Sequence, residues 1–341
     1  MRVAVIVNEF ETLVPSQATA MLIYALAEAV DEAYVLGVAD VGVAGDGALV
    51  ASARRVPGPG GRDHAPAGPI AMDAVAACVA ELRQVAPCAL PLADCGAVLI
   101  RTNPARDGRS WAHDGALELL DQLHHRGVQV VNRPDGLRAA GSKLFLAALP
   151  SWTRPATLIS ADRAALEGFV RDAGGPTVVK PVRGTRGADV FKLTPDAVNV
   201  RVTLDVLLRQ GFVMAQQFVP AAVDGDTRVI VLDGEILTID GVAAAIRRVP
   251  SAKDFRSNLH TGGHAEPATL SDGMRAAVAA IGPILCARGI RLAGLDFLGD
   301  LVCEVNVFAT GGFRDAERFG QRPFIRHTVA ALLAPAPPAR G

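Results

Sequence analysis

The chain has 341 residues, of which half are hydrophobic and a fifth are charged, so it can bury a large core and is not a disordered chain. Its 34 basic and 35 acidic side chains leave a formal net charge of -1, which argues against binding to nucleic acid or to an anionic membrane. The sequence contains no apolar run of about 18 residues, the length that spans a bilayer, and its length predicts two domains or three lobes.

The first part of the chain alternates apolar strands with helices. Strands are predicted at residues 1–7, 35–38, 97–100 and 129–131, and helices at 16–30, up to about 85 and at 114–125. A hairpin is predicted at 39–55 around Gly45-Asp46-Gly47. This alternation predicts an α/β domain with a doubly wound, Rossmann-like parallel sheet.

The pattern changes after about residue 145. Strands are predicted at 177–180 and 213–218, a hairpin at 227–240, a helix at 272–288, and a second strand pair at 293–307. Residues 251–266 are polar and predict a mobile loop, and the tail at 334–341 is expected to fray. The second part therefore predicts lobes that mix helices with antiparallel strands.

The five cysteines are odd in number and show no C-x-x-C spacing. This pattern favours a reducing compartment, and we expect a cytoplasmic protein. It argues against both a disulfide framework and a zinc site.

Lysine is scarce, because only four of the 34 basic residues are lysines. Lys180 ends an apolar strand and precedes a loop with Gly184 and Gly187, and such a loop lets backbone N–H groups approach a phosphate. A simple turn is the alternative. Lys192 and Lys253 are interpreted as lysines that remain by chance.

A second cluster carries oxygen ligands. Glu304 and Asn306 share one face of a strand, and Asp296 lies nearly opposite them across the Gly299-Asp300 turn. Two carboxylates and an amide suit Mg²⁺, with Mn²⁺ as the alternative metal. A solvated polar face would be the simpler interpretation, but the neighbouring Val, Leu and Phe residues disfavour it.

Three arginines of the second half, Arg228, Arg248 and Arg256, could each hold a carboxylate or phosphate with the guanidinium fork. In a chain this rich in arginine, a solvated surface position is the alternative for each of them.

Taken in order, these segments resemble the ATP-grasp fold and, within it, the bacterial glutathione synthetases, over roughly residues 1–330. The segments that carry the resemblance are Lys143-Leu144-Phe145, Val179-Lys180-Pro181, residues 214–220, residues 224–229, Gly294-Leu295-Asp296 and Glu304-Val305-Asn306. The resemblance implies a pre-ATP-grasp substrate domain at 1–135 and an ATP-grasp domain at 136–333, with a small lobe at about 150–215 and a C-terminal lobe at about 216–333.

The resemblance also implies residue roles. Lys143 and Lys180 would hold the ATP phosphates under the loop of Gly184 and Gly187. The hinge that binds adenine would consist of Gln216, Gln217, Phe218 and Val219, with Asp226 near the nucleotide or its ribose. Asp296, Glu304 and Asn306 would bind the metal. Arg228, Arg248 and Asn258 would surround the transferred phosphate, and Arg101, Arg256, Gly311 and Gly312 would contact substrates. Residues 251–264 would form a flexible lid.

The implied activity is ATP-dependent joining of a small-molecule acid to an amine through an acyl phosphate, as in glutathione synthesis from γ-glutamylcysteine and glycine. A homodimer or homotetramer is expected. Two stretches depart from the family: Arg101-Thr102-Asn103-Pro104-Ala105 replaces Arg-Lys-Asp-Pro-Pro, and residues 307–314 replace a Ser-Pro-Thr segment. A natural-product peptide or amide ligase with other substrates is therefore one alternative, and a non-catalytic ATP-binding regulatory module is another.

Overall fold

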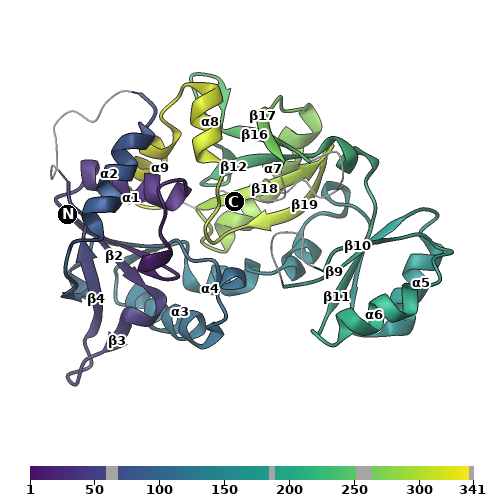
Figure 1. Ribbon diagram of the computed structural model, residues 1–341, viewed down its shortest axis with the longest axis horizontal. Helices are drawn as coiled ribbons and strands as arrows, with labels where there is room; N and C mark the ends of the chain where they lie inside the picture. Colours follow the sequence, from purple (N-terminus) through teal and green to yellow (C-terminus); the bar gives the residue numbers. More distant parts are fainter. Residues whose placement is uncertain (59–67, 184–188, 251–262, 338–341) are drawn as a thin grey trace.

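The computed structural model describes residues 1–58, 68–183, 189–250 and 263–337. In these residues the strands build three larger sheets, which we call the sheets of the N-terminal domain, the small lobe and the C-terminal lobe. Figure 1 shows the C-terminal lobe between the other two parts, with the small lobe standing apart on the right. The expected domain and lobe limits remain predictions.

The N-terminal sheet has a parallel centre. Its parallel strands lie in the order β2-β1-β6-β7, with bounds Glu32–Gly37, Arg2–Val7, Ala97–Ile100 and Gln129–Val131. The predicted hairpin is present as β3 (Val41–Val43) and β4 (Leu49–Arg55); it joins β2 antiparallel and also carries β5 (Cys88–Pro91). The sheet is therefore mixed rather than purely parallel.

Strand β1 is almost wholly apolar because both of its faces are covered. Val3 and Val5 belong to one core and Ala4 and Ile6 to the other, as expected of a strand inside a doubly covered sheet.

The helices of this part are α1 (Ala18–Ala29), α2 (Met72–Leu82), α3 (Ser110–His125) and α4 (Pro134–Ala140), with short 3-10 turns η1 (Phe10–Thr12), η2 (Val38–Asp40), η3 (Leu92–Asp94) and η4 (Pro104–Arg106).

The small lobe is an antiparallel sheet with two helices on one side. Its elements are η5 (Lys143–Ala148), η6 (Ser151–Thr153), β8 (Thr157–Ser160), α5 (Arg163–Asp172), β9 (Thr177–Pro181), β10 (Phe191–Leu193), α6 (Val200–Leu208) and β11 (Val213–Gln217). The strand order is β10-β9-β11-β8. Val179 and Ala215 face α5 and α6 in a separate core, so the residues that alternate with them, including Lys180, face the other side.

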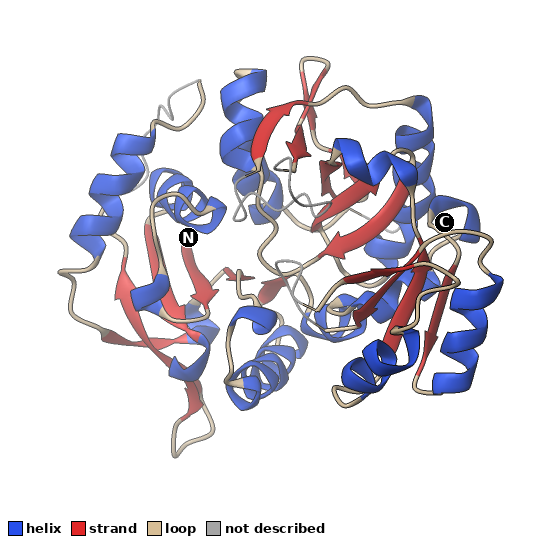
Figure 2. Cartoon of the chain, turned by 45° about the vertical axis from the view of Figure 1, so that its right-hand side comes forward, coloured by secondary structure: helices blue, strands red, loops and turns tan. Residues whose placement is uncertain are grey.

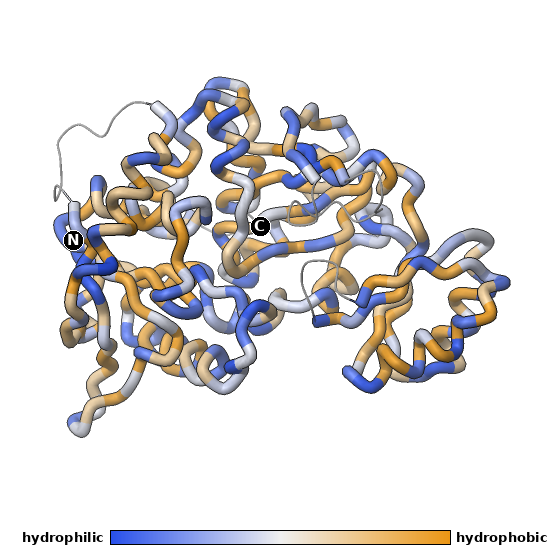
Figure 3. The backbone as a smooth tube through the Cα atoms, viewed as in Figure 1, coloured by the Kyte–Doolittle hydropathy of each residue, from blue (hydrophilic) through white to orange (hydrophobic). Residues whose placement is uncertain are grey.

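The C-terminal lobe contains the strand pairs that the sequence predicts. Its elements are η7 (Pro220–Asp224), β12 (Asp226–Leu232), β13 (Glu235–Ile236), β14 (Thr238–Ile239), β15 (Val242–Ala243), β16 (Ala245–Val249), β17 (His264–Pro267), α7 (Asp272–Ala287), β18 (Leu292–Leu298), β19 (Leu301–Asn306), α8 (Phe313–Gly320) and α9 (Phe324–Leu333). The order is β17-β16-β12-β18-β19. Figure 3 shows the apolar strands (orange) inside more polar surroundings.

One prediction in this lobe needs correction. Residues 264–266 were expected in a mobile loop, but they belong to β17, which pairs with β16 from Val249 opposite His264 onwards. Pairing with the free edge of β16 outweighs the polar composition of this stretch. Residues 251–262 of the expected lid lie outside the described residues. Within the described part of the chain, no helix is long and apolar enough to cross a membrane.

A buried amide joins the N-terminal domain to the C-terminal lobe. The side-chain Nδ2 of Asn132, just after β7, donates to the carbonyls of Leu292 (2.8 Å) and Val307 (2.7 Å). Its Oδ1 accepts from the N–H groups of Arg291 (2.8 Å) and Leu292 (2.9 Å). All the bonding capacity of this side chain is used, which fixes the start of β18 and the end of β19 against the N-terminal sheet.

We therefore expect Asn132→Ala to lower the free energy of unfolding by about 2–4 kcal/mol, because it leaves several buried backbone groups without partners. Urea unfolding followed by circular dichroism measures the change. The matched control is Asn199→Ala at an exposed position without a side-chain capping bond, which should change stability little. Equal effects of the two variants would contradict this role of Asn132.

Candidate active site

A chain of paired charges lies at the centre of the C-terminal lobe. Arg228 on β12 faces Asp296 on β18 and binds it with two bonds, Nε to Oδ1 and Nη2 to Oδ2, both 2.7 Å. Arg248 on β16 donates from Nη2 to Asp296 Oδ2 (2.8 Å) and from Nε to Asp226 Oδ1 (2.6 Å). Strand register explains the arrangement, because Arg228 pairs with Asp296 and Arg248 with Asp226 directly across neighbouring strands.

Asp296 is ionised although it is buried. Burial alone would raise the pKa of its carboxyl group, but the charges and hydrogen bonds of Arg228 and Arg248 lower that pKa to about 2. Burial likewise favours neutral Arg248, and the charges of Asp296 and Asp226 outweigh it and raise the pKa of that guanidinium. The group therefore stays fully charged across the physiological pH range.

The three predicted metal ligands lie together on β18 and β19. Glu304 pairs directly with Asp296, and Asn306 Nδ2 donates to Asp296 Oδ2 at 3.2 Å. These side chains offer the oxygen atoms that Mg²⁺ prefers, so they fit the metal chemically. Among the described residues no three His, Cys, Asp or Glu side chains form a metal-binding group. The set predicted here contains two carboxylates and the amide of Asn306. That these three residues bind the metal remains a prediction.

Two lysines face this acidic strand pair. The Nζ atom of Lys143, the first residue of η5, lies 3.9 Å from Glu304 Oε1. Lys180 Nζ donates to Gln216 Oε1 at 3.2 Å, and Gln216 in turn donates to Thr157 Oγ1 at 3.0 Å. Burial lowers the pKa of Lys180, and the nearby charge of Lys143 also lowers it. Lys143 and Lys180 thus lie close to the same carboxylate, Glu304, and with the strand pair they form one candidate site.

The predicted hinge is formed by the end of β11 and the residues after it. Two of its N–H groups are used within the small lobe: Gln217 donates to the Ala156 carbonyl and Phe218 to the Pro176 carbonyl, both at 2.9 Å. The N–H of Val219 donates to no backbone carbonyl among the described residues, and its contact with adenine remains a prediction. Asp226, expected near the nucleotide, instead binds Arg248 here, so its nucleotide contact remains a prediction.

Of the predicted substrate residues, Arg101 is buried and joins two parts of the chain. Its Nη1 and Nη2 donate to the carbonyls of Phe308 (3.3 Å) and Thr310 (2.8 Å), and its Nε has no partner among the described residues. Burial lowers the pKa of Arg101 to about 10. Gly311 and Gly312 come directly after Thr310 in the chain. Gly312 has a left-handed φ of 101° and lies beside the Arg228 side chain. Arg101 thus positions the loop before α8, and its substrate contact remains a prediction.

Four predicted site residues lie outside the described residues: Gly184, Gly187, Arg256 and Asn258.

Two residues of the candidate site, Cys303 and Thr157, are not among those that the sequence predicts. Cys303 is the extra residue of a bulge in β19, since Asp296 pairs with Glu304 but Phe297 pairs with Val302. Thr157 supports Gln216. No local sequence pattern reveals either residue, because both depend on strand pairing.

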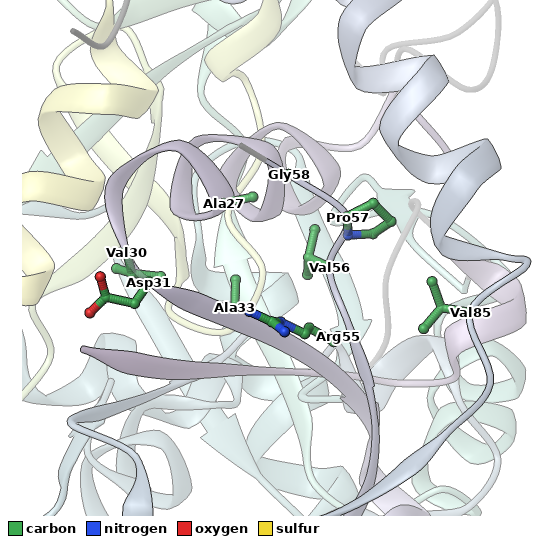
Figure 4. A pocket seen from close by; sticks show the side chains of 9 residues that line it. All are labelled: Ala27, Val30, Asp31, Ala33, Arg55, Val56, Pro57, Gly58 and Val85. Atoms are coloured by element: carbon green, nitrogen blue, oxygen red, sulfur yellow. The ribbon is translucent and has the colours of Figure 1, made fainter. Parts of the chain in front are cut away.

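Two surface hollows lie away from the candidate site. The only predicted site residue that lines either of them is the exposed Gln217. One, of about 410 Å³, lies on the N-terminal domain between α1 and the end of β4, with Val30, Val56 and Val85 among its apolar residues (Figure 4). The other lies between β8 and α5, on the helical side of the small lobe. The candidate site is identified by its charged residues and not by either hollow.

An antiparallel lobe that carries Lys180, set against a second lobe with paired arginines and clustered carboxylates, is the arrangement of an ATP-grasp ligase. Solved structures share this fold: D-cycloserine synthetase DcsG (TM-score 0.62, 16% identity, 97% of this chain and 98% of that one) and the ATP-grasp ligase PsnB complexed with a phosphomimetic variant of its minimal precursor, Mg and ADP (TM-score 0.58, 19% identity, 97% of each chain). At these identities the likeness shows the fold alone.

Residues 1–138 match the N-terminal domain of prokaryotic glutathione synthetase, and residues 142–321 match its ATP-grasp domain. The chain belongs to the prokaryotic glutathione synthetase family. It is 36% identical over 219 residues to a glutathione synthetase of Parasynechococcus marenigrum (64% of this chain, 69% of that one). It is 34% identical over 245 residues to that of Synechococcus elongatus (71% and 72%) and over 230 residues to that of Escherichia coli K12 (67% and 70%).

The protein is therefore an ATP-dependent amide-bond ligase of the glutathione synthetase type, which uses ATP with Mg²⁺ and acts on small molecules. This membership favours an enzyme over the non-catalytic regulatory module.

We expect Glu304→Gln to preserve the fold and to lower turnover by roughly a hundredfold, because the substitution removes a charge that would help neutralise the phosphates. The measurement is ADP release with saturating acid and amine. Glu118→Gln, at an exposed position on α3, is the matched control. Turnover close to that of the control at ordinary Mg²⁺ concentrations would exclude Glu304 as a ligand.

Lys180 gives a prediction about pH. Its pKa is lowered in the fold, so its positive charge, and with it ADP affinity, should be lost as the pH rises, beginning below the ordinary lysine pKa of 10.5. Lys180→Arg should bind ADP more weakly at neutral pH, since the fork does not fit a compact ammonium site, but its affinity should not fall on the alkaline side. Calorimetric titration with ADP from pH 7 to 10 tests both points; parallel alkaline losses in the two proteins would show that another group titrates.

Proposed function

We propose that this ligase joins a γ-glutamyl acid to a small amino acid, with γ-glutamylcysteine and glycine as substrates and glutathione, ADP and phosphate as products. The observation that carries the proposal is the set of two arginines and clustered oxygen ligands facing Lys143 and Lys180. The curated relatives named glutathione synthetase support the choice of substrates.

The reaction requires two transfers. A substrate carboxylate oxygen attacks the γ-phosphorus of ATP, the bond to the bridging oxygen of ADP breaks, and an acyl phosphate forms. The amine then attacks the acyl carbon, loses a proton and expels inorganic phosphate. Phosphoryl transfer of this kind depends on positioning and charge neutralisation rather than on a protein nucleophile.

Lys143 and Lys180 would hold the phosphates from the small-lobe side of the site. On the other side, Arg228 uses Nε and Nη2 for Asp296, and Arg248 uses Nε and Nη2 for Asp226 and Asp296. In each case Nη1 is the group that forms no side-chain bond with the described residues, so it can donate to the oxygens of the acyl phosphate. Bound Mg²⁺, held by Asp296, Glu304 and Asn306, would supply further neutralisation of phosphate charge.

Asp296 has a positioning role in this scheme. It fixes both guanidinium planes before any substrate arrives, so little side-chain entropy is lost when the anion binds. Residues 251–262, expected to cover the intermediate, lie outside the described residues.

One observation favours a second candidate, a ligase of the same chemistry with another acid and amine. Thr102, where the family carries a lysine, is buried (2% exposed). The backbone of Asn103 is held by Asn8 through bonds of 2.6 and 2.9 Å. Buried Thr102 cannot offer the charge of a lysine, and Asn103 offers an amide in place of a carboxylate, so this segment would recognise a different acid or the same acid by other contacts.

We also propose that the protein works in the cytoplasm as a homodimer or homotetramer. The five free cysteines support a reducing compartment. Light scattering after size-exclusion chromatography would measure the assembly.

Incubation of the purified protein with ATP, Mg²⁺ and a panel of acids and amines, with products read by mass, tests the function. We expect ADP release to require both an acid and an amine, and γ-glutamylcysteine with glycine to give the highest kcat/KM. A different best pair would establish the second candidate. ADP release without any acid or amine dependence would contradict amide-bond formation itself.

A further inference from the structure

A third one of the four lysines, Lys192, also lies near the candidate site. Lys192 was interpreted as a lysine that remains by chance, but its Nζ atom lies 3.7 Å from the centroid of the Phe218 ring. A cation so close to a ring face is attracted by the negative face of the π system. Phe218 belongs to the predicted adenine hinge, so this contact links β10 to the hinge.

Strand register places Lys192 on the same face of the small-lobe sheet as Lys180. Across the sheet, Lys192 pairs with Val178, Val178 with Gln216, and Gln216 with Thr157. Directly paired residues in antiparallel strands point to one side, and the Gln216–Thr157 hydrogen bond shows that this row is in contact. Val178 and Lys180 are two apart on β9, so their side chains also point to this side.

The opposite face is occupied by helices. Val179, Leu193 and Ala215 alternate with the residues of this row and pack with Leu166 and Leu204 of α5 and α6. Figures 1 and 2 show both helices together on the outer side of the sheet. Lys192 therefore points away from the helices, into the side that carries Lys180 and Gln216.

Lys180 and the row of Lys192 lie at different positions along strand β9. Lys180 lies at the end near Lys143 and Glu304, where the phosphates are expected. The row of Lys192 lies two residues along β9, about 7 Å away. It lies on the hinge side, because Thr177 pairs with Gln217 and Pro176 accepts from the N–H of Phe218.

We propose that Lys192 and Phe218 together form the base end of the nucleotide site, in which the Lys192 ammonium donates to an acceptor on the base or ribose rather than to the phosphates. The Phe218 ring holds the ammonium in place, and the ammonium fixes the ring as a wall of the base pocket. This inference rests on ATP use by the proposed ligase and adds a nucleotide contact to it.

The test is competition by ATP and by AMP against a fluorescent ADP analogue. Lys192→Met should weaken both competitors by the same factor, roughly threefold to tenfold, since both carry the same base and ribose. At saturating acid and amine, the KM for ATP should rise by a similar factor while kcat stays within twofold. Arg201→Met on α6, an exposed cation of the helical side, is the matched control and should change neither.

A double-mutant cycle tests the pair. Phe218→Leu should weaken both nucleotides, and the double variant should be little worse than the more affected single variant, because the two side chains act as a unit. A thermal melt of each variant checks that the fold is kept, and the Lys192→Met comparison stands even if Phe218→Leu does not fold.

Three results would overturn the inference: Lys192→Met indistinguishable from Arg201→Met, a loss for ATP without a loss for AMP, or full additivity of Lys192→Met and Phe218→Leu. Failure of the proposed function would look different, because the unaltered protein would then bind nucleotide without forming any amide product, or would not bind nucleotide at all.

Discussion

The pairing of Asp296 with two arginines is the interaction on which the rest of the site depends. Four strands of the C-terminal lobe meet around this carboxylate, which is 1% exposed and still ionised. An ion buried in this way persists only because its charge and its hydrogen bonds are matched. Without Asp296, Arg228 and Arg248 would be two mostly buried cations that repel one another, with only Asp226 left to balance them. The carboxylate therefore allows the lobe to concentrate positive charge where an anionic intermediate must be held, and its neighbour Glu304 adds the negative charge that suits a metal.

In the small lobe, the alternation of side chains along each strand directs the cationic residues toward the site. One face of its sheet is apolar and carries the helices, while the other carries Lys180, Gln216 and Lys192 beside the buried Met214. The polar face is thus a direct consequence of the period of two in a strand. Lys143 comes from neither sheet; its N–H donates to the Val182 carbonyl at 3.1 Å, which fixes η5 to the end of β9.

Much of this arrangement follows from the sequence because it is local. The strand at 97–100, the Asp233-Gly234 turn, with φ values of 50° and 81°, and the shared face of Glu304 and Asn306 all depend on residues a few positions apart. The arginine partners of Asp296 lie 48 and 68 residues away, and only strand register brings them together. The bulge at Cys303, the extension of β17 to His264 and the face of Lys192 have the same origin. Each is decided by what a strand pairs with, which composition and periodicity do not contain.

The sharing of hydrophobic cores has a consequence for how the molecule unfolds. The core that holds Ile6 and Val98 of the N-terminal sheet also holds Leu295 and Phe297 of β18. The helix side of the small lobe has a core of its own, and Met214 of β11 joins the main core from the other side of that sheet. The first and last thirds of the chain thus form one cooperative folding unit, although the middle third separates them in sequence. The small lobe is an insertion in that unit, and its opening would remove only Met214 of β11 and a few packed neighbours from the main core. Partial unfolding would therefore expose the Lys180 face of the small-lobe sheet first, and a fragment that begins after the N-terminal sheet would lack the core residues that this sheet supplies.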